Sequence, residues 1–322
     1  MDSKVIYIFI YHAYNIFFPF ADISYNRPKL SPLATWSSNA TTIANSNLVG
    51  SNPYGLYVDS NDTVYVTSYT ENRIIIWSQG DSNSSKSITT NTLYSVSIFV
   101  TSFGEIFVDN GYTYGRIDIY SLNMTNSTST MFIPTRCFGI FVDINNTIYC
   151  SLYSHHQIVA KFVNDTIDTK RIVAGTGCAG NDTYMLFGPI GIFVDSNFNL
   201  YVADYFNNRV QLFRSGQLNG TTVAGGGVST PITLYGPTSV VLDADDHLFI
   251  VDHRNHRIVG SEPNGFRCVV GCSGTNGTSA SELNYPWAMG FDSQGNIYVT
   301  DSSNGRIQKF ALADNSSSMY LT

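Results

Sequence analysis

Three charged clusters with one spacing are the first residues in this sequence that could take part in chemistry. Each reads Asp-x-x-Asn-x-Arg, and they lie at residues 204–209, 252–257 and 301–306. An aspartate in a turn can accept backbone N–H bonds and also pair with a nearby arginine. Because the cluster recurs, we expect each copy to do the same architectural work, and we assign it no catalytic role.

Histidines offer a second kind of chemistry, because several of them from different segments could bind zinc. The candidates are His155 and His156 in one loop and His253 and His256 in another. Zinc needs three or four converging ligands, whereas His156 and His256 share one repeat position. In other repeats that position is held by Asn72, Asn208 and Gly305. We therefore interpret it as a turn position and predict no metal site and no cofactor.

Motifs of common hydrolases and nucleotide-binding proteins are missing from the sequence. It contains no G-x-S-x-G elbow, no H-E-x-x-H pair and no G-x-x-x-x-G-K phosphate loop. The glycines at 225–227 form a single run between repeats, which favours a flexible connection. No catalytic residue is assigned.

The charged clusters belong to a longer repeated pattern of short strands. Residues 188–213 contain three strand-like runs, at 190–194, 200–203 and 209–213, separated by turn residues. A fourth short run precedes the next copy. The residue that closes the first run recurs at intervals of 42 to 52 residues, as Asp59, Thr101, Asp143, Asp195, Asp243 and Asp292. Four strands per repeat of this length predict the blades of a β-propeller, six in number.

The Asp-x-x-Asn-x-Arg clusters, each after a strand such as IYVTD, resemble NHL repeats over roughly residues 36–310. Two repeats depart from the pattern: Thr101 replaces the closing Asp, and His155-His156-Gln157 replaces Asn-x-Arg. The resemblance implies a six-bladed propeller, and we expect an all-β fold of four-stranded antiparallel blades. Residues 36–322 would form one domain, with blades starting near residues 53, 95, 137, 189, 237 and 286.

The two ends of the chain are expected to meet in the last blade. Residues 36–46 match the end of a third strand, a turn and a fourth-strand run, but have no first or second strand of their own. We therefore predict that residues 41–44 complete blade 6 as its outer strand and close the ring. Residues 316–322 are the competing segment, and residues 26–35 are a lead-in.

The N-terminus suggests export. Residues 5–20 are apolar and aromatic apart from His12 and Asn15. They are too short to cross a bilayer easily and suit the core of a secretory signal, although the cleavage site is poor. We interpret residues 1–25 as a signal peptide, with an uncleaved anchor, a misjudged start or a buried strand as alternatives, and predict a secreted or extracellular protein.

Eleven N-x-S/T sequons also favour export, since glycosylation requires it. They are Asn39, Asn61, Asn83, Asn123, Asn126, Asn145, Asn164, Asn181, Asn219, Asn276 and Asn315. Nine follow first or third strands, which places them on one rim of the propeller. Asn181 and Asn276 fall on the other rim.

The five cysteines suggest two disulfides. Cys137 and Cys150 flank one predicted hairpin, and Cys268 and Cys272 lie four residues apart, which leaves Cys178 unpaired. The alternative is that all five are small buried residues in a reducing compartment.

The sparsely glycosylated rim is predicted to be a binding face, because it is rich in the aromatic residues typical of binding hot spots. The candidates are Tyr54, Tyr69, Tyr112, Tyr114, Tyr153, Tyr205, Phe206 and Trp287. We expect about half of them to be exposed. The partner would be a protein, peptide or glycan bound by a monomer.

The composition argues against nucleic-acid binding, and the family resemblance leaves one enzymatic alternative. A net charge of −7 with no Lys/Arg cluster disfavours nucleic acid. The resemblance implies one alternative, a metal-dependent propeller lyase or hydrolase similar to amidating lyases or lactonases. The predicted inner strands are apolar apart from their ends, which favours the non-catalytic reading.

Overall fold

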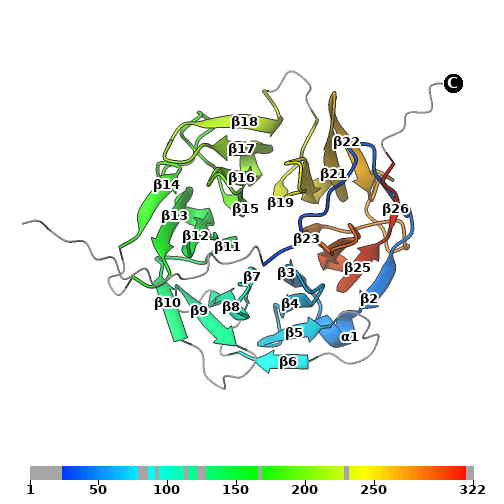
Figure 1. Cartoon of the computed structure of the whole chain (residues 1–322), viewed down its shortest axis with the longest axis horizontal. Helices are drawn as coiled ribbons and strands as arrows, with labels where there is room; N and C mark the ends of the chain where they lie inside the picture. Colours follow the sequence, from blue (N-terminus) through cyan, green and yellow to red (C-terminus); the bar gives the residue numbers. More distant parts are fainter. Residues whose placement is uncertain are drawn as a thin grey trace, which may run out of the picture.

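The computed structural model describes residues 24–78, 86–90, 94–111, 115–121, 128–165, 169–227 and 232–316. Six four-stranded antiparallel sheets are arranged as a ring around a central axis (Figure 1). The prediction of a six-bladed β-propeller is therefore confirmed. Cys178 and the binding-face candidates Tyr54, Tyr69, Tyr153, Tyr205, Phe206 and Trp287 lie within the described residues, whereas Tyr112 and Tyr114 lie outside them.

Each blade contributes one strand to each of four layers. The innermost strands, nearest the axis, are β3 (Pro53–Val58), β7 (Ile98–Val100), β11 (Ile140–Val142), β15 (Pro189–Val194), β19 (Pro237–Leu242) and β23 (Pro286–Phe291). The second strands are β4 (Val64–Ser68), β8 (Glu105–Asp109), β12 (Thr147–Leu152), β16 (Leu200–Asp204), β20 (Leu248–Asp252) and β24 (Ile297–Asp301).

The two outer layers follow the same order. The third strands are β5 (Arg73–Trp77), β9 (Arg116–Ser121), β13 (Gln157–Phe162), β17 (Arg209–Phe213), β21 (Arg257–Glu262) and β25 (Arg306–Phe310). The outermost strands are β6 (Lys86–Thr89), β10 (Thr128–Phe132), β14 (Arg171–Ala174), β18 (Gly220–Gly225), β22 (Gly265–Val270) and β2 (Thr41–Ala44). Short helices connect some of the strands: α1 (Ser46–Val49), η1 (Tyr153–His155), η2 (Tyr205–Asn207), η3 (His253–Asn255) and η4 (Ser302–Asn304).

The aspartate that closes an innermost strand shapes the hairpin to the second strand. Oδ1 of Asp195 accepts the backbone N–H groups of Asn197 (2.9 Å) and Asn199 (2.8 Å), and the equivalent aspartates of blades 1, 3, 5 and 6 bond in the same way. In blade 2 the Thr101 hydroxyl accepts one such bond, from Glu105 N at 3.2 Å. The predicted hairpin role is confirmed.

The ring is closed by an N-terminal strand. β2 pairs with β25 in blade 6, with Thr41 opposite Lys309 and Thr42 opposite Gln308. A second pairing joins β1 (Thr35–Trp36) to β26 (Leu312–Asp314). The predicted closure by residues 41–44 is confirmed, and the segment from 317 to 322 lies outside the described residues.

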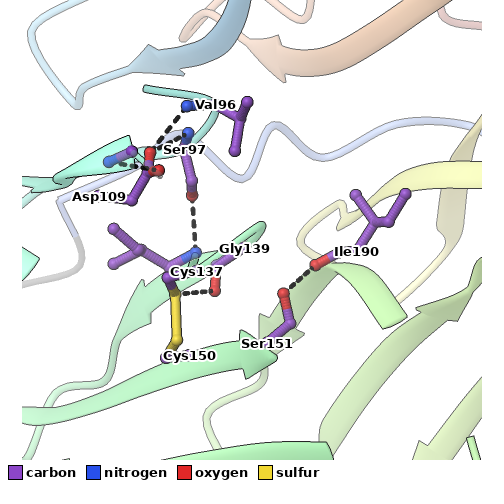
Figure 2. Close-up of a disulfide and its surroundings, with 10 residues drawn as sticks. Val96, Ser97, Asp109, Cys137, Gly139, Cys150, Ser151 and Ile190 are labelled. Atoms are coloured by element: carbon purple, nitrogen blue, oxygen red, sulfur yellow. Dashed lines mark hydrogen bonds between the residues drawn. A yellow bond between two sulfur atoms is a disulfide. The ribbon is translucent and has the colours of Figure 1, made fainter. Parts of the chain in front are cut away.

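Hydrogen bonds from side-chain hydroxyls connect neighbouring blades around the axis. Ser151 Oγ donates to Ile190 O at 2.5 Å, as Figure 2 shows, and Thr238 Oγ1 donates to Trp287 O at 2.8 Å. Blades approach closely at this level: a Cβ added to Gly139 would lie 2.3 Å from Ile190 O. The third residue of every blade, counted from the predicted starts at 53, 95, 137, 189, 237 and 286, is accordingly small, namely Gly55, Ser97, Gly139, Gly191, Ser239 and Ala288.

Two disulfides are present. Cys137 pairs with Cys150 in blade 3 (Figure 2), and Cys268 pairs with Cys272 at the end of β22. Both predicted pairs are confirmed, and Cys178 is free and exposed. Disulfides of this kind fit an oxidising compartment outside the cytosol. No helix among the described residues is long and apolar enough to span a membrane.

Candidate functional site

A pocket lies on the axis, between the innermost strands of all six blades. Its volume is about 120 Å³, and its walls include Leu56, Ile98, Ile140, Ile192 and Val240. None of the described residues that line it carries a charge. The pocket can therefore accommodate a small uncharged group, or roughly four water molecules by volume.

The N-terminal lead-in, together with Ser24 and Tyr25 before it, closes one end of this pocket. Because these two residues belong to the folded ring, the predicted signal peptide can extend no further than residue 23. Residues 24–30, here called the plug segment, run to the centre of the ring, where the dark blue trace ends in Figure 1. The Tyr25 ring contacts Phe99, Phe141 and Phe193, with centroids 6.4, 5.5 and 5.3 Å away. Burial raises the pKa of Tyr25 to about 12. The phenol thus stays neutral and forms the floor of the pocket.

Polar contacts hold the plug segment against the remaining blades. Asn26 Nδ2 donates to Asp59 O at 2.7 Å, and Phe291 O lies 3.2 Å from the same nitrogen. Arg27 donates to Asp243 O at 2.9 Å and pairs with Asp246. These partners lie at the end of an innermost strand or in the turn that follows it, so we name this side the plug face. The side formed by loops after second and fourth strands is the aromatic face.

The pocket opens toward the aromatic face, where rings from neighbouring loops touch one another. Trp287 lines the pocket and contacts Tyr54 (4.7 Å between centroids), which contacts Tyr69 (4.9 Å). Phe138 also lines the pocket and stacks on Tyr153 at 4.7 Å. We define the aromatic cluster as Tyr54, Tyr69, Tyr94, Phe138, Tyr153, Phe187, Tyr205, Phe206, Tyr285 and Trp287.

The structure brings together the six described binding-face candidates, but it buries more of them than the sequence indicated. Phe206 is exposed (40%), whereas Tyr205 is buried (8%). Tyr54, Tyr69, Tyr153 and Trp287 are half-buried because their rings pack on one another. Of the six described candidates, one is exposed and four are partly exposed, compared with the expectation that about half of the eight would be exposed. The two candidates Tyr112 and Tyr114 lie outside the described residues.

Sequence reasoning missed Tyr94, Phe138, Phe187 and Tyr285. Tyr94 contacts Tyr69 at 5.0 Å, Phe187 contacts Phe206 at 4.6 Å, and Tyr285 contacts His253 at 5.1 Å. A signal was available for Phe187 and Tyr285, because Tyr285 directly precedes, and Phe187 lies two residues before, a proline that begins an innermost strand. Aligning the residues that precede each innermost strand across the repeats would have placed Phe187 and Tyr285 near the mouth of the pocket.

The histidines of this face bond to the backbone. Nδ1 of His156 accepts the N–H of Gly188 and Nδ1 of His256 accepts that of Tyr285, both at 3.1 Å. Asn208 Oδ1 accepts the N–H of Gly236 in the same way, at 2.8 Å. The predicted turn role of this position is therefore confirmed at three junctions.

His253 plays a different part. Its Nδ1 lies 2.9 Å from Pro286 O, a contact that requires a proton on this nitrogen, and its ring lies 5.3 Å from that of Trp287. Burial lowers the pKa of His253 to about 4. Across the described residues, no three His, Cys, Asp or Glu side chains are grouped so that they could hold a metal ion.

The Asp-x-x-Asn-x-Arg clusters fasten the loops of the aromatic face. Oδ2 of Asp204 accepts bonds from Asn207 Nδ2 and Arg209 Nε, each at 2.8 Å, and Oδ1 accepts Phe187 N at 2.7 Å. Arg209 also donates a hydrogen bond from Nη1 to the backbone carbonyl oxygen of Asn181. Asp252 and Asp301 repeat this arrangement. Burial raises the pKa of Asp204 and of Asp252, and their hydrogen bonds oppose the shift.

Blade 2 provides a variant of this arrangement. Asp109 accepts the N–H groups of Val96 (2.7 Å), Ser97 (2.9 Å) and Gly111 (3.2 Å), whereas Arg116 pairs with Asp118. Figure 2 shows the Asp109 carboxylate facing Val96 and Ser97. Burial raises the pKa of Asp109 to about 7. The carboxyl group orders a loop and does not line the pocket.

The sequon asparagines within the described residues are all exposed. On the plug face these are Asn39, Asn61, Asn145, Asn164, Asn219 and Asn315, and on the aromatic face Asn181 and Asn276. Asn83, Asn123 and Asn126 lie outside the described residues. Glycosylation itself stays a prediction.

Comparison with known families now adds to this geometry. The family model of the NHL repeat matches residues 234–260 and 283–310, which cover the first three strands of blades 5 and 6 almost completely. The same strand pattern recurs around all six blades. The protein is an NHL-repeat propeller. No curated protein sequence matches the chain.

Solved structures share the fold of this NHL propeller. One is a protein of unknown function from Bacteroides thetaiotaomicron (15% identity, TM-score 0.69, covering 85% of this chain and 76% of that one). A second is virginiamycin B lyase from Staphylococcus aureus (15%, 0.60, 85% and 99%). A third is an auxiliary nutrient binding protein from Bacteroides ovatus (16%, 0.63, 91% and 76%). At these identities the likeness shows the fold alone.

Proposed function

We propose that this protein is an exported, non-catalytic NHL propeller that binds a ligand at the mouth of its axial pocket, on the aromatic face. The observation that carries this proposal is the aromatic cluster, which extends from the pocket wall at Phe138 and Trp287 to the exposed ring of Phe206. Aromatic residues around a pocket are typical of binding hot spots. The two disulfides support export.

The predicted glycans favour the same face. Of the exposed sequon asparagines, six lie on the plug face and two, Asn181 and Asn276, on the aromatic face. Glycans there would cover the side opposite the pocket mouth. Among the solved structures, a nutrient-binding propeller also supports binding, although the lyase shares the same fold.

Photo-crosslinking tests the proposal. p-Benzoylphenylalanine would replace Phe206 on the aromatic face or, as a matched control, Phe103, which is 60% exposed in a turn of the plug face. We expect a ligand from the extracellular medium to crosslink at position 206 and not at 103. Phe206→Ala should then weaken binding of that ligand at least tenfold and Phe103→Ala less than twofold. Equal crosslinking at both positions would refute the assignment.

Tyr69 and Tyr153 extend the test around the mouth. Both are half-buried, so alanine at either position should weaken binding with a small effect on melting temperature. Tyr205 is unsuitable for this purpose, because its burial means that substitution would also alter stability. Metal analysis of the purified protein addresses the alternative, since one bound zinc or calcium per chain would favour a lyase or hydrolase.

A further inference from the structure

Most side chains that line the axial pocket are apolar, and the polar ones, Tyr25, Asn26, Tyr57, Ser97, Thr238, Ser239 and Trp287, are all uncharged. The hydroxyl of Ser97 accepts the N–H of Ile140 at 2.8 Å, and the hydroxyl of Thr238 donates to Trp287 O. Both side chains thereby connect blades. A charged group that entered would lose its hydration without gaining a partner, which is costly. The lining thus selects for an uncharged, apolar group.

The floor of the pocket is fixed in position. Residues 24–28 contact every blade, through the rings of blades 2 to 4 and the turns of blades 1, 5 and 6. The backbone adds bonds from Ser60 N to Ser24 O (2.8 Å) and from Ala244 N to Pro28 O (3.1 Å). Tyr25 therefore sets the depth that an entering group can reach.

We propose that the pocket receives one uncharged apolar side chain of a polypeptide ligand, and that Tyr25 determines the longest side chain accepted. This inference rests on the proposed binding function of the aromatic face. A volume of about 120 Å³ suits a single side chain. The aromatic cluster around the mouth is suited to contact the adjoining peptide.

A saccharide fits this mouth less well. Sugars need acceptors and donors for many hydroxyl groups, and carboxylates commonly provide them. Here the aspartates of the neighbouring loops, Asp204, Asp252 and Asp301, are buried, and each already accepts three hydrogen bonds. These aspartates therefore offer few acceptor positions to a sugar, and the charged groups that lie over rings of the cluster are the guanidinium groups of Arg136 at Phe138 and Arg254 at Tyr205.

Blocked peptides of the form acetyl-Gly-Gly-X-Gly-Gly-amide test the side-chain preference by isothermal titration calorimetry on the full chain. With X changed from Ala to Val to Leu, we expect affinity to rise about fourfold per added methylene, as burial of apolar surface dictates. Lys or Glu at X should bind no better than Gly. Equal binding of the charged peptides, or tighter binding of neutral oligosaccharides, would overturn the proposal.

Substitution of Tyr25 tests the floor. Tyr25→Ala should extend the preference from Leu to a longer unbranched side chain such as that of 2-aminooctanoic acid, by at least tenfold in relative affinity. Tyr25→Phe keeps the ring and should leave the order unchanged. If Tyr25→Ala fails to fold, Tyr25→Trp should instead shorten the accepted side chain. An unchanged length preference in the folded variants would overturn the role of Tyr25.

Phe206→Ala separates the inference from the proposed function. If it weakens all the peptides by one factor and the side-chain order persists, both proposals are supported. If it has no effect while the order persists, the pocket binds as inferred but the aromatic face does not take part. If it weakens binding while the order is absent, the face binds and the pocket does not.

Discussion

Tyr285 adopts a backbone conformation that two other blades give to glycine. Its φ is 49°, compared with 65° for Gly188 and 61° for Gly236 at the equivalent positions. A left-handed conformation is uncommon for a bulky residue and marks local strain. Tyr285 is nevertheless exposed (41%) and packs on His253 and His256. We infer that the Tyr285 ring contributes to ligand contact at the mouth of the pocket and adds little to the stability of the fold.

Tyr285→Gly therefore separates binding from stability. Relief of the left-handed conformation, worth about 1 kcal/mol, should offset the lost ring contacts, so that the free energy of unfolding changes by less than about 1 kcal/mol. Ligand affinity should fall. Gly236→Ala is the matched control and should destabilise, because its Cβ would lie 2.8 Å from the Tyr205 ring. Marked destabilisation by Tyr285→Gly, measured by urea unfolding, would contradict the interpretation.

Protonation of His253 is expected to lower the free energy of unfolding at acidic pH. Its pKa is near 4 in the folded protein and about 6.5 when unfolded, so the unfolded state binds more protons between these values. Stability from this residue is thus complete above pH 6.5 and falls as the pH drops toward 4, by up to about 3 kcal/mol. His253→Asn should flatten the urea-unfolding free energy over this interval relative to the native protein. Parallel profiles would show that His253 does not titrate this way.

At the scale of elements, the Cys137–Cys150 disulfide joins the segment before the innermost strand β11 to the second strand β12. Both cysteines are fully buried, so the bond constrains the innermost hairpin of blade 3. By contrast, Cys268–Cys272 lies at the end of an outer strand. We therefore expect the two bonds to differ in their influence on the ring.

Replacing Cys137 and Cys150 together by alanine should lower the free energy of unfolding by about 2 to 4 kcal/mol, because the unfolded chain loses a cross-link. Cys178→Ala, which removes an exposed thiol, should change it by less than about 0.5 kcal/mol. Peptide mapping without reductant should recover the bridged pair from exported protein. Two free thiols in that material would argue against both the bond and the compartment.

The strands and turns were largely predictable from the sequence, because the same residue types recur at the same positions in each blade. Hairpin aspartates such as Asp195, and the arginine partners of Asp204, Asp252 and Asp301, recur at fixed spacing and make the same contacts in the structure. The burial of Tyr205 was not predictable, because it depends on how neighbouring loops pack. Residue patterns within one blade contain no such information.

For the molecule as a whole, the N-terminal region has two roles in the ring. β2 completes blade 6, and the plug segment contacts all six blades. Closure was predictable because residues 41–44 copy the fourth-strand run of other blades. The plug was not, since residues 24–30 have no counterpart in the repeat. Its contacts join residues more than 200 positions apart, such as Arg27 and Asp243.

Two truncations should separate these roles. Removing residues 1–45 takes away both β2 and the plug and should lower the melting temperature of the whole propeller cooperatively, by about 5 °C or more. Removing residues 1–34 keeps β2 and should cause a smaller loss. Differential scanning calorimetry measures both. A 1–45 truncation that melts within a degree of the full chain would show that closure contributes little.

The position of the plug also sets the direction in which the propeller presents its mouth. The chain reaches Ser24 and leaves β26 on the plug face, where Asn315 hydrogen-bonds Ser31 and Lys29. A tether attached upstream of Ser24, whether a lipid, a membrane segment or a fusion partner, therefore pulls on the sealed base of the ring. The aromatic face then points away from the tether. Immobilisation through the N-terminal or the C-terminal end of the chain should leave the mouth of the pocket accessible to solution.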